Sequence, residues 1–352
     1  MANNSQSSIP KRVNGLTILL GMGNIGDPSN SLVRFPTPES AKAFLSAFAE
    51  RGYRRLDSAR NYPPGSPETA EPVIGEVLKL ISIEQQQEGS EGVLKGIPFV
   101  IDSKLRYSPP NTHREEMIKK SLADTFRDLR VDKVHIEYLH SIDETSDTRE
   151  TCRAMDEAYK AEKFEQFGLC NASISQLDRF YNACEEQGLT IRPTAYQGDY
   201  NVLSRECEED GILERVRSYG MSFYAFSPAG GGLLNPRDYR ERVGGRFDEN
   251  TKMGQGYHSF WYTSPSLVNA AQALRDLSEK HNIDGHHMAL RWIVWHSQLS
   301  GEHNDGIIMG ASSIEQLNAN LDAIESGPLP SDVVRAIEDV YEKVRVGKRG
   351  NS

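Results

Sequence analysis

Eight segments of the chain are predicted to be β-strands, because apolar residues crowd into runs of about four to eight positions between turn residues. The predicted strands cover residues 16–21, 53–57, 99–105, 134–140, 164–170, 191–197, 221–227 and 306–312. Between most of them, apolar residues recur with a helical period, at 39–52, 113–130, 148–163, 173–188 and 210–220. Ser173 and Asp210 suit helix N-caps, and Gly52, Gly188 and Gly220 suit helix ends.

The repeated alternation of strand and helix predicts an α/β fold, a closed parallel (β/α)8 TIM barrel with its helices outside. A doubly wound open sheet is the competing arrangement. A long glycine-rich and aromatic loop, residues 230–264, follows the seventh strand, and residues 329–344 form an extra C-terminal helix. Because no linker divides the chain, residues 1–352 are expected to form a single domain, with a flexible N-terminus at about 1–12 and a tail at about 347–352.

Composition and charge narrow the class of protein. The 352 residues, 38% of them hydrophobic, suffice for a large core, and the formal net charge of -10 argues against a nucleic-acid partner. Residues 1–15 lack the apolar segment of a signal peptide, and no run reaches the roughly 18 apolar residues of a membrane span. We therefore expect no membrane partner and a cytoplasmic location. The four cysteines form no C-x-x-C pair and are expected to be reduced thiols.

Residues 21–26, GMGNIG, match the dinucleotide-binding pattern G-x-G-x-x-G and follow a predicted strand. That pattern works only if a helix begins at once, so that its N-terminus meets the pyrophosphate. Here the chain continues with three prolines, and the first clear helix begins near Glu39. We therefore interpret GMGNIG as a loop whose backbone requires glycine.

Two further patterns are better explained by structure than by chemistry. Tyr159 and Lys163, with Ser146 upstream, resemble the catalytic set of short-chain dehydrogenases, but a predicted strand begins directly after Lys163. A solvent-facing helix end explains them better. His286 and His287 are adjacent, so they point to different helix faces, and the chain has no H-E-x-x-H motif. No metal is expected.

Four polar residues fall at or just after the ends of consecutive predicted strands. Asp57 ends the second strand, Lys104 lies at the end of the third, His140 ends the fourth, and Tyr62 lies in the loop after the second. Each residue alone also has a purely structural explanation. Asp57 could form a turn, Lys104 could be a solvated strand end, His140 could be a hydrogen-bonded histidine at the rim, and Tyr62 could be a packed aromatic of the loop. In a barrel, however, these strand ends meet at the face that carries active sites. Their joint placement therefore favours a catalytic site.

These residues and their order resemble the aldo-keto reductase family, most closely its aflatoxin-aldehyde and succinic-semialdehyde reductase branch. The resemblance runs from LGMG through LDSARNY, SKL, YLHSID, FGLCNAS, TAYQGDYN, FYAFSPAGGGLL, GRF and HSQL to GASSIEQLNANL. It implies an eight-stranded barrel and NADPH-dependent reduction of an aldehyde or ketone to an alcohol. Carried over by motif, the catalytic tetrad is Asp57, Tyr62, Lys104 and His140.

The chemistry of carbonyl reduction accounts for these residue types. A carbonyl that accepts hydride develops negative charge on its oxygen, so a proton donor must stand nearby. Tyr62 would be this general acid. Lys104 would bring the pKa of Tyr62 down from about 10, and Asp57 would hold Lys104 in place. His140 would donate a hydrogen bond that orients the carbonyl.

The resemblance also implies residues that bind NADPH. Asn171 and Gln197 would hold the nicotinamide carboxamide, Phe226 would stack on the ring, and Arg246 is the candidate for the phosphates. Cys170 stands where the family usually has serine, and its weaker hydrogen bonding would loosen the grip on the cofactor. The residues implied for the pyrophosphate and the adenosine end are Ser227, Gly230, Gly231, Leu233, Gly310, Ser312, Ser313, Gln316 and Asn320.

The substrate is expected to be a neutral, apolar or aromatic carbonyl compound. Ser259 stands where the branch typically carries an arginine that binds a substrate carboxylate, which argues against an acidic aldehyde. The other residues expected to edge the pocket are Met22, Tyr257, Phe260 and Trp261.

Two other functions fit the same resemblance. One is an NADPH-binding regulatory or assembly subunit with little turnover, against which the intact tetrad weighs. The other is an enzyme of secondary metabolism that oxidises an alcohol. The branch includes dimers, so the protein could form a homodimer. The sequence does not determine the natural substrate or the stereochemistry of the reaction.

Overall fold

The computed structural model describes residues 10–86, 98–234, 247–248, 250–251, 254–256 and 265–349. Within these ranges, nine strands form one sheet in sequence order, and β2 also pairs with β9, so eight parallel strands close into a barrel. This confirms the predicted fold class. The strands are β1 Arg12–Val13, β2 Leu16–Gly21, β3 Arg55–Asp57, β4 Val100–Leu105, β5 Val134–Leu139, β6 Phe164–Cys170, β7 Pro193–Asp199, β8 Ser222–Phe226 and β9 Gly306–Met309.

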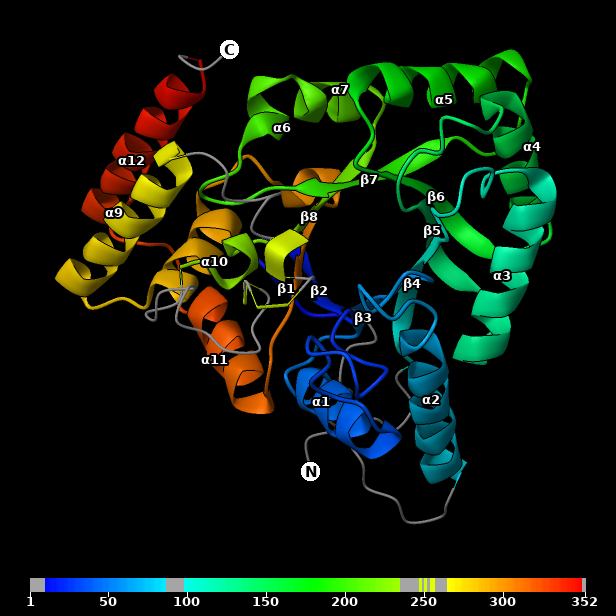
Figure 1. Cartoon of the computed structure of the whole chain (residues 1–352), viewed down its shortest axis with the longest axis horizontal. Helices are drawn as coiled ribbons and strands as arrows, with labels where there is room; N and C mark the ends of the chain where they lie inside the picture. Colours follow the sequence, from blue (N-terminus) through cyan, green and yellow to red (C-terminus); the bar gives the residue numbers. More distant parts are fainter. Residues whose placement is uncertain are drawn as a thin grey trace, which may run out of the picture.

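The eight predicted strands correspond to β2–β9, whereas β1 is additional. It pairs antiparallel with β2. Next to it, Nζ of Lys11 lies 2.7 Å from Oε1 of Glu325. Helices surround the barrel, and α9 lies beside α12 at one side of the molecule (Figure 1). The helices are α1 Pro38–Glu50, α2 Ala70–Gln86, α3 Glu115–Leu129, α4 Thr148–Lys160, α5 Ile174–Glu186, α6 Glu206–Glu209, α7 Ile212–Ser218, α9 Pro265–His281, α10 Gly285–Trp295, α11 Ile314–Glu325 and α12 Ser331–Arg349, with short 3-10 turns η1 Gly230–Gly232 and η3 Gly301–His303.

The helix caps agree with the sequence in one case and differ in another. Ser173 caps α5, where its side chain accepts a hydrogen bond from the backbone N–H of Gln176 and the Gln176 side chain accepts one from the backbone N–H of Ser173. The prediction that Asp210 is an N-cap is wrong, because Asp210 ends the short helix α6 and Gly211 precedes α7. The extra C-terminal helix is present as α12 and extends to Arg349.

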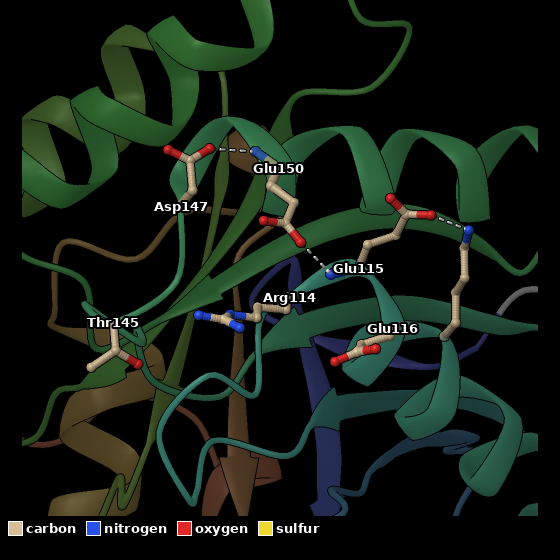
Figure 2. Close-up of a pocket in the computed structure, with 7 residues that line it drawn as sticks. Arg114, Glu115, Glu116, Thr145, Asp147 and Glu150 are labelled. Carbon is tan, nitrogen blue, oxygen red and sulfur yellow. Dashed lines mark hydrogen bonds and ion pairs between the residues drawn. The ribbon is translucent and has the colours of Figure 1, made fainter.

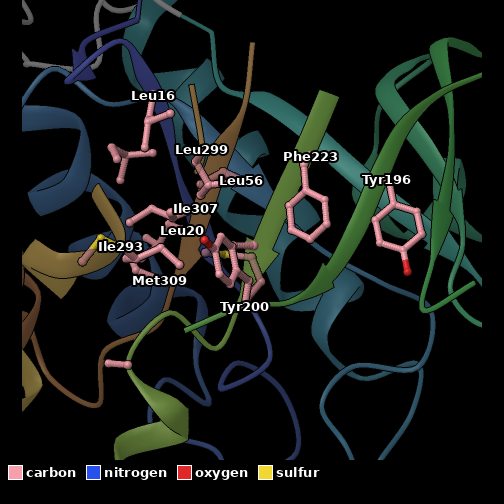
Figure 3. Close-up of a cluster of buried hydrophobic side chains, with 14 of the residues drawn as sticks. Leu16, Leu20, Leu56, Tyr196, Tyr200, Phe223, Ile293, Leu299, Ile307 and Met309 are labelled. Carbon is pink, nitrogen blue, oxygen red and sulfur yellow. The ribbon is translucent and has the colours of Figure 1, made fainter. Parts of the chain in front are cut away.

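The hydrophobic core has an inner and an outer part. Side chains that alternate along the strands point either into the barrel or toward the helices. Figure 3 shows part of the outer core, in which Leu20, Ile307 and Met309 from β2 and β9 lie against Ile293 of α10. The inner cluster consists of Leu19, Ile136, Tyr138, Cys170, Ala195, Tyr224 and Ile308, with Phe226 packed on it.

Gly168 on β6 makes room for the inner cluster. A Cβ atom at this position would lie 2.1 Å from Cδ1 of Tyr138, well inside van der Waals contact. Tyr138 can therefore fill the barrel interior only because its neighbour across the strands has no side chain. None of the helices in the described ranges is both long and apolar enough to cross a membrane.

Candidate active site

The carboxyl ends of β3, β4 and β5 bring the four predicted tetrad residues together. Asp57 ends β3, Lys104 is the fifth of six residues in β4, and His140 follows β5 directly. Successive side chains of a strand point to opposite faces. Leu56 and Leu105 belong to the outer core, so their neighbours Asp57 and Lys104 point into the barrel. The structure therefore places the tetrad at the end of the barrel where the sequence predicts it.

Lys104 lies at the centre of the site. Its ammonium donates to both carboxylate oxygens of Asp57, each at 2.7 Å, and to the backbone carbonyl of Ser58 at 2.8 Å. The hydroxyl of Tyr62 lies 3.3 Å from Nζ of Lys104 and donates to Oδ2 of Asp57 at 3.2 Å. Asp57 and Lys104 are fully buried, so water does not weaken this contact.

Burial and charge set the protonation of these groups. Burial alone would lower the pKa of Lys104, but the charge of Asp57 raises it above its ordinary value, so Lys104 is an ammonium. Burial and the charge of Asp57 together raise the pKa of Tyr62, and Lys104 only partly opposes them. The net direction is thus opposite to the expected lowering. It keeps the hydroxyl of Tyr62 protonated at neutral pH.

His140 stands beside Tyr62 as a neutral imidazole. Its ring meets the Tyr62 ring edge-on with centroids 5.7 Å apart, and the Tyr107 ring packs on it at 5.1 Å. Burial, and secondarily the charge of Lys104, hold the pKa of His140 well below its ordinary value. A neutral imidazole carries one N–H and can donate one hydrogen bond without adding charge.

The two amides expected to meet the nicotinamide lie side by side at the ends of β6 and β7. The backbone N–H of Asn171 donates to the carbonyl of Gln197 at 3.0 Å, and its side chain lies 3.4 Å from the carbonyl of His140. The side chain of Gln197 donates to Oδ1 of Asp57 at 3.0 Å. Gln197 thus contacts the tetrad itself, a contact that the sequence does not reveal.

The glycine-rich turn after β8 has the backbone that close approach to a ligand requires. Gly230, Gly231 and Gly232 all have positive φ, and Ser227 has φ of 50°. Phe226 is half-buried and packs on the inner cluster. Leu233 is fully buried, so only its backbone can face a ligand. Cys170 belongs to the inner cluster, and burial raises the pKa of its thiol.

The residues predicted for the adenosine end gather at the start of α11. Ser313 caps this helix through the N–H of Gln316, and Ser312 donates to the Gln316 side chain at 2.7 Å. The side-chain amide of Asn320 donates to the carbonyl of Gly310 at 3.3 Å, and its own carbonyl oxygen is buried with no partner within the described ranges. A Cβ atom on Gly310 would meet open space.

Several predicted site residues are not placed by the structure. The expected pocket and phosphate residues Arg246, Tyr257, Ser259, Phe260 and Trp261 lie outside the described residues. Met22 is described and is fully buried in the outer core. Its place at the edge of a substrate pocket stays a prediction, because the other residues expected there lie outside the described ranges.

The GMGNIG loop packs against the tetrad loop. A Cβ atom on Gly23 would lie 3.9 Å from the Tyr62 ring. At Gly26, which has φ of +131°, a Cβ atom would lie 2.5 Å from Oγ1 of Thr69 and 2.9 Å from Cδ of Pro63. The first helix after it, α1, begins only at Pro38. The interpretation as a glycine-dependent loop therefore agrees with the structure.

Tyr159 and Lys163 lie at the opposite end of the barrel from the tetrad. Tyr159 is near the C-terminal end of α4, and Lys163 directly precedes β6. The ammonium of Lys163 lies 5.3 Å from the centroid of the Phe126 ring, on α3. Tyr159 is half-buried and packs on the ring of Phe164, with centroids 6.0 Å apart, so the pair lies at a packed helix end rather than at the solvent-facing one that the sequence predicts.

Sequence reasoning missed a second ion pair inside the barrel. Arg55 donates from Nη2 to Oδ1 and Oδ2 of Asp102 at 3.0 and 2.9 Å. Both side chains are buried, and they come from the two strands that carry Asp57 and Lys104. The available signal is spacing, because Arg55 precedes Asp57 by two residues and Asp102 precedes Lys104 by two.

A hollow of about 580 Å³ opens elsewhere, between the first turns of α3 and α4. Figure 2 shows Glu150 accepting a hydrogen bond from the backbone of Glu115 and Arg114 extending toward Thr145. The hollow is lined by Arg114, Glu115, Glu116, Lys119, Thr145, Asp147 and Glu150. It contains no tetrad residue and is therefore separate from the candidate active site.

Comparison with known proteins agrees with this geometry. Residues 17–342 match the Aldo/keto reductase family. An aldo-keto reductase of Pseudocercospora fijiensis is 34% identical over 86% of this chain and 97% of its own length. Aflatoxin B1 aldehyde reductase member 4 of Homo sapiens is 31% identical over 88% of this chain and 90% of its own. The oxidoreductase sirO of Leptosphaeria maculans is 30% identical over 93% and 94%.

Proposed function

Because the chain belongs to the aldo/keto reductase family, we propose that it reduces an aldehyde or ketone with NADPH, using Tyr62 as the general acid. Its membership makes it an oxidoreductase that uses a nicotinamide cofactor. The observation that carries the proposal is the contact of Lys104 with both Asp57 and Tyr62 inside a buried site.

The residues present fit a nicotinamide cofactor. Two side-chain amides stand at adjacent strand ends beside the tetrad, and a glycine turn with positive φ follows β8. Asn320 adds a buried carbonyl oxygen without a partner in the described part of the chain. Asn171 and Gln197 would hold the nicotinamide, and residues 227–233 and 310–320 would hold the phosphates and adenosine. When bound, NADPH supplies the hydride.

The protein's own groups supply the proton and hold the carbonyl. As negative charge develops on the substrate oxygen, Tyr62 donates its phenolic proton, which its raised pKa keeps in place until then. Lys104 stabilises the resulting phenolate through the charge it carries 3.3 Å away. Asp57 holds Lys104, and neutral His140 donates the hydrogen bond that orients the oxygen.

The proposed substrate is a neutral apolar or aromatic carbonyl compound. One relative, by its name, reduces aflatoxin B1 aldehyde. Ser259 lacks the positive charge that would bind a substrate carboxylate. We therefore expect 4-nitrobenzaldehyde to be reduced faster than succinic semialdehyde, and NADPH to be used in preference to NADH.

The test removes only the proposed acid. In Tyr62→Phe, kcat for 4-nitrobenzaldehyde should fall by about 10² to 10⁴, the range for a lost general acid, while NADPH still binds, as followed by quenching of protein fluorescence. Tyr159→Phe is the matched control, because it removes the same hydroxyl from the rejected Y-x-x-x-K pair, and it should keep full turnover. Near-normal turnover in Tyr62→Phe would contradict the role. NADPH binding by the wild-type protein without turnover of any carbonyl would favour a regulatory subunit.

A further inference from the structure

We propose that Arg55 and Asp102 are positioning residues for the tetrad, because their buried ion pair lies directly below Asp57 and Lys104 and balances the charge around Tyr62. The proposal rests on the proposed carbonyl reduction, in which Tyr62 donates the proton, Lys104 stabilises the phenolate and Asp57 holds Lys104.

The four charges alternate in sign on two neighbouring strands. On β3, Arg55 precedes Asp57, and on β4, Asp102 precedes Lys104, each by two residues, so all four side chains point into the barrel. Asp57 and Asp102 are register partners in the β3–β4 pairing. The ion pairs run across the strands, from Lys104 to Asp57 at 2.7 Å and from Arg55 to Asp102 at 2.9 Å. Each carboxylate thus pairs diagonally with a cation of the neighbouring strand, while the two carboxylates, which carry the same charge, lie directly opposite each other in register.

The lower pair is held as firmly as the upper one. The carboxylate of Asp102 is fully buried and also accepts a hydrogen bond from the backbone N–H of Ile136 at 3.2 Å. Nδ1 of His135 lies 3.2 Å from Oδ1 of Asp102 and 2.7 Å from Nη2 of Arg55. The Arg55 guanidinium also lies 5.7 Å from the centroid of the Tyr224 ring. Asp102 is therefore contacted from three sides inside the barrel, by Arg55, by His135 and by the backbone of Ile136.

This arrangement is costly if its only task is to fill space. Barrel interiors are usually packed with branched apolar residues. Replacing a buried ion pair with apolar side chains of similar volume is often neutral or stabilising. An ion pair one layer below a charged catalytic group instead acts on that group, because the low dielectric of the interior leaves its field unscreened.

The direction of the effect follows from the charges. Burial raises the pKa of Asp57, the negative charge of Asp102 raises it further, and an unpaired Arg55 would act in the opposite direction. The titratable groups that face Asp57 are Lys104 and Asp102 from β4, Tyr62 from its own loop and Cys170 from β6. Those that face the lower pair are His135 and Tyr138 from β5 and Tyr224 from β8.

The first experiment unbalances the pair. Asp102→Asn keeps an acceptor for Arg55 but leaves the guanidinium charge unpaired, since arginine does not lose its proton in proteins. A net positive charge favours the Tyr62 phenolate, so the basic limb of the kcat/KM profile should move to lower pH by roughly one unit. Arg55→Gln combined with Asp102→Asn removes both charges and should return the limb to the wild-type position. Glu186→Gln, which neutralises an exposed acid on α5, is the control for total charge and should not move it.

A second readout needs no turnover. In protein labelled with ¹³C at the aspartate carboxyl carbons, Asp57→Asn identifies the Asp57 signal, and its pH titration should move to lower pH in Asp102→Asn. A wild-type protein that reduces no carbonyl would overturn the proposed function, and the carboxyl titration would still test the ion pair. If neither the pH profile nor the Asp57 titration moves, the pair only stabilises the fold and our inference is wrong. A lower melting temperature alone, without either shift, would overturn it equally.

Discussion

The two faces of strand β4 both carry buried charges, but these are arranged differently. On the inner face Lys104 meets Asp57, and every carboxylate has a cation within 3 Å. On the outer face Ser103 donates to Glu71 of α2 at 2.7 Å, and Glu71 pairs with Arg60 at 2.7 Å. Next to Ser103 in register is Glu137, whose two carboxylate oxygens are buried without a partner among the residues described.

The charges on the inner face lie around the tetrad, whereas those on the outer face hold the loop that carries Tyr62. The inner charges lie in two ion pairs, Lys104 with Asp57 and Arg55 with Asp102, and the first of these contacts the hydroxyl of Tyr62. On the outer face, Arg60 lies two residues before Tyr62 and fixes that loop to α2 and α3 through Glu71 and Asp128, the latter at 2.8 Å. Burial raises the pKa of Glu137 well above its ordinary value and so favours its neutral form. The outer face therefore holds the loop that carries Tyr62 against α2 and α3.

The largest effect on stability should come from breaking the outer ion pair. Arg60→Met leaves the fully buried carboxylate of Glu71 without its cation, which should cost about 3–5 kcal/mol of unfolding free energy. Urea denaturation followed by circular dichroism measures this loss. Arg60→Met combined with Glu71→Leu removes both charges and should recover most of it. A single variant as stable as the wild type would show that Arg60 does not hold the Tyr62 loop.

A smaller loss should follow from crowding the inner face. In Gly168→Ala, the new Cβ atom would lie 2.1 Å from Cδ1 of Tyr138, so the ring must move from the barrel interior. Overpacking of this kind costs roughly 1–3 kcal/mol. Gly310→Ala is the matched control, because its Cβ atom meets nothing within 4 Å, and it should melt like the wild type. Equal melting temperatures for both variants would mean that Tyr138 is not tightly packed.

The smallest effect on the free energy of unfolding should come from Glu137 and should depend on pH. It distinguishes this unpaired acid from the acids that lie in ion pairs. The folded state holds the proton of Glu137 more tightly than the unfolded chain does, so the contribution of Glu137 to the free energy of unfolding falls as pH rises above about 4.3. Glu137→Gln removes that loss. Relative to the wild type, this variant should gain up to about 1.4 kcal/mol per pH unit above that point, until the folded-state pKa is reached. Denaturation at pH 5, 6 and 7 tests this, and a difference that is constant with pH would show that Glu137 is ionised when folded.

Much of the fold follows from the sequence because the barrel strands are short, apolar and separated by turn residues. Strand β1 escapes prediction because two residues carry no periodic pattern. Helix α2 is obscured by Pro72 and Gly75 in its first two turns. Gly75 is needed there, since a Cβ atom would lie 2.0 Å from the backbone oxygen of Asp128 on α3.

Part of the candidate site can likewise be predicted from the sequence, and part of it cannot. Asp57, Lys104 and His140 can be identified from the sequence because each lies at or beside a strand end. The contact of Gln197 with Asp57 and the pairing of Arg55 with Asp102 depend on how strands pair and on which side chains meet across the barrel. The upward shift of the Tyr62 pKa likewise depends on its burial, which no local pattern reveals.

The pairing of β2 with β9 has a consequence for how the protein is made. Thr17 pairs with Gly306, so the contact that closes the barrel joins residues almost a whole chain apart. Contacts of such long sequence separation form late and slow folding. On the ribosome, the strands that carry Asp57, Lys104 and His140 emerge early, yet they remain an open sheet whose edge at residues 18–20 of β2 lacks its partner until β9 arrives. During synthesis, that edge is where the nascent chain is most exposed to pairing with another chain.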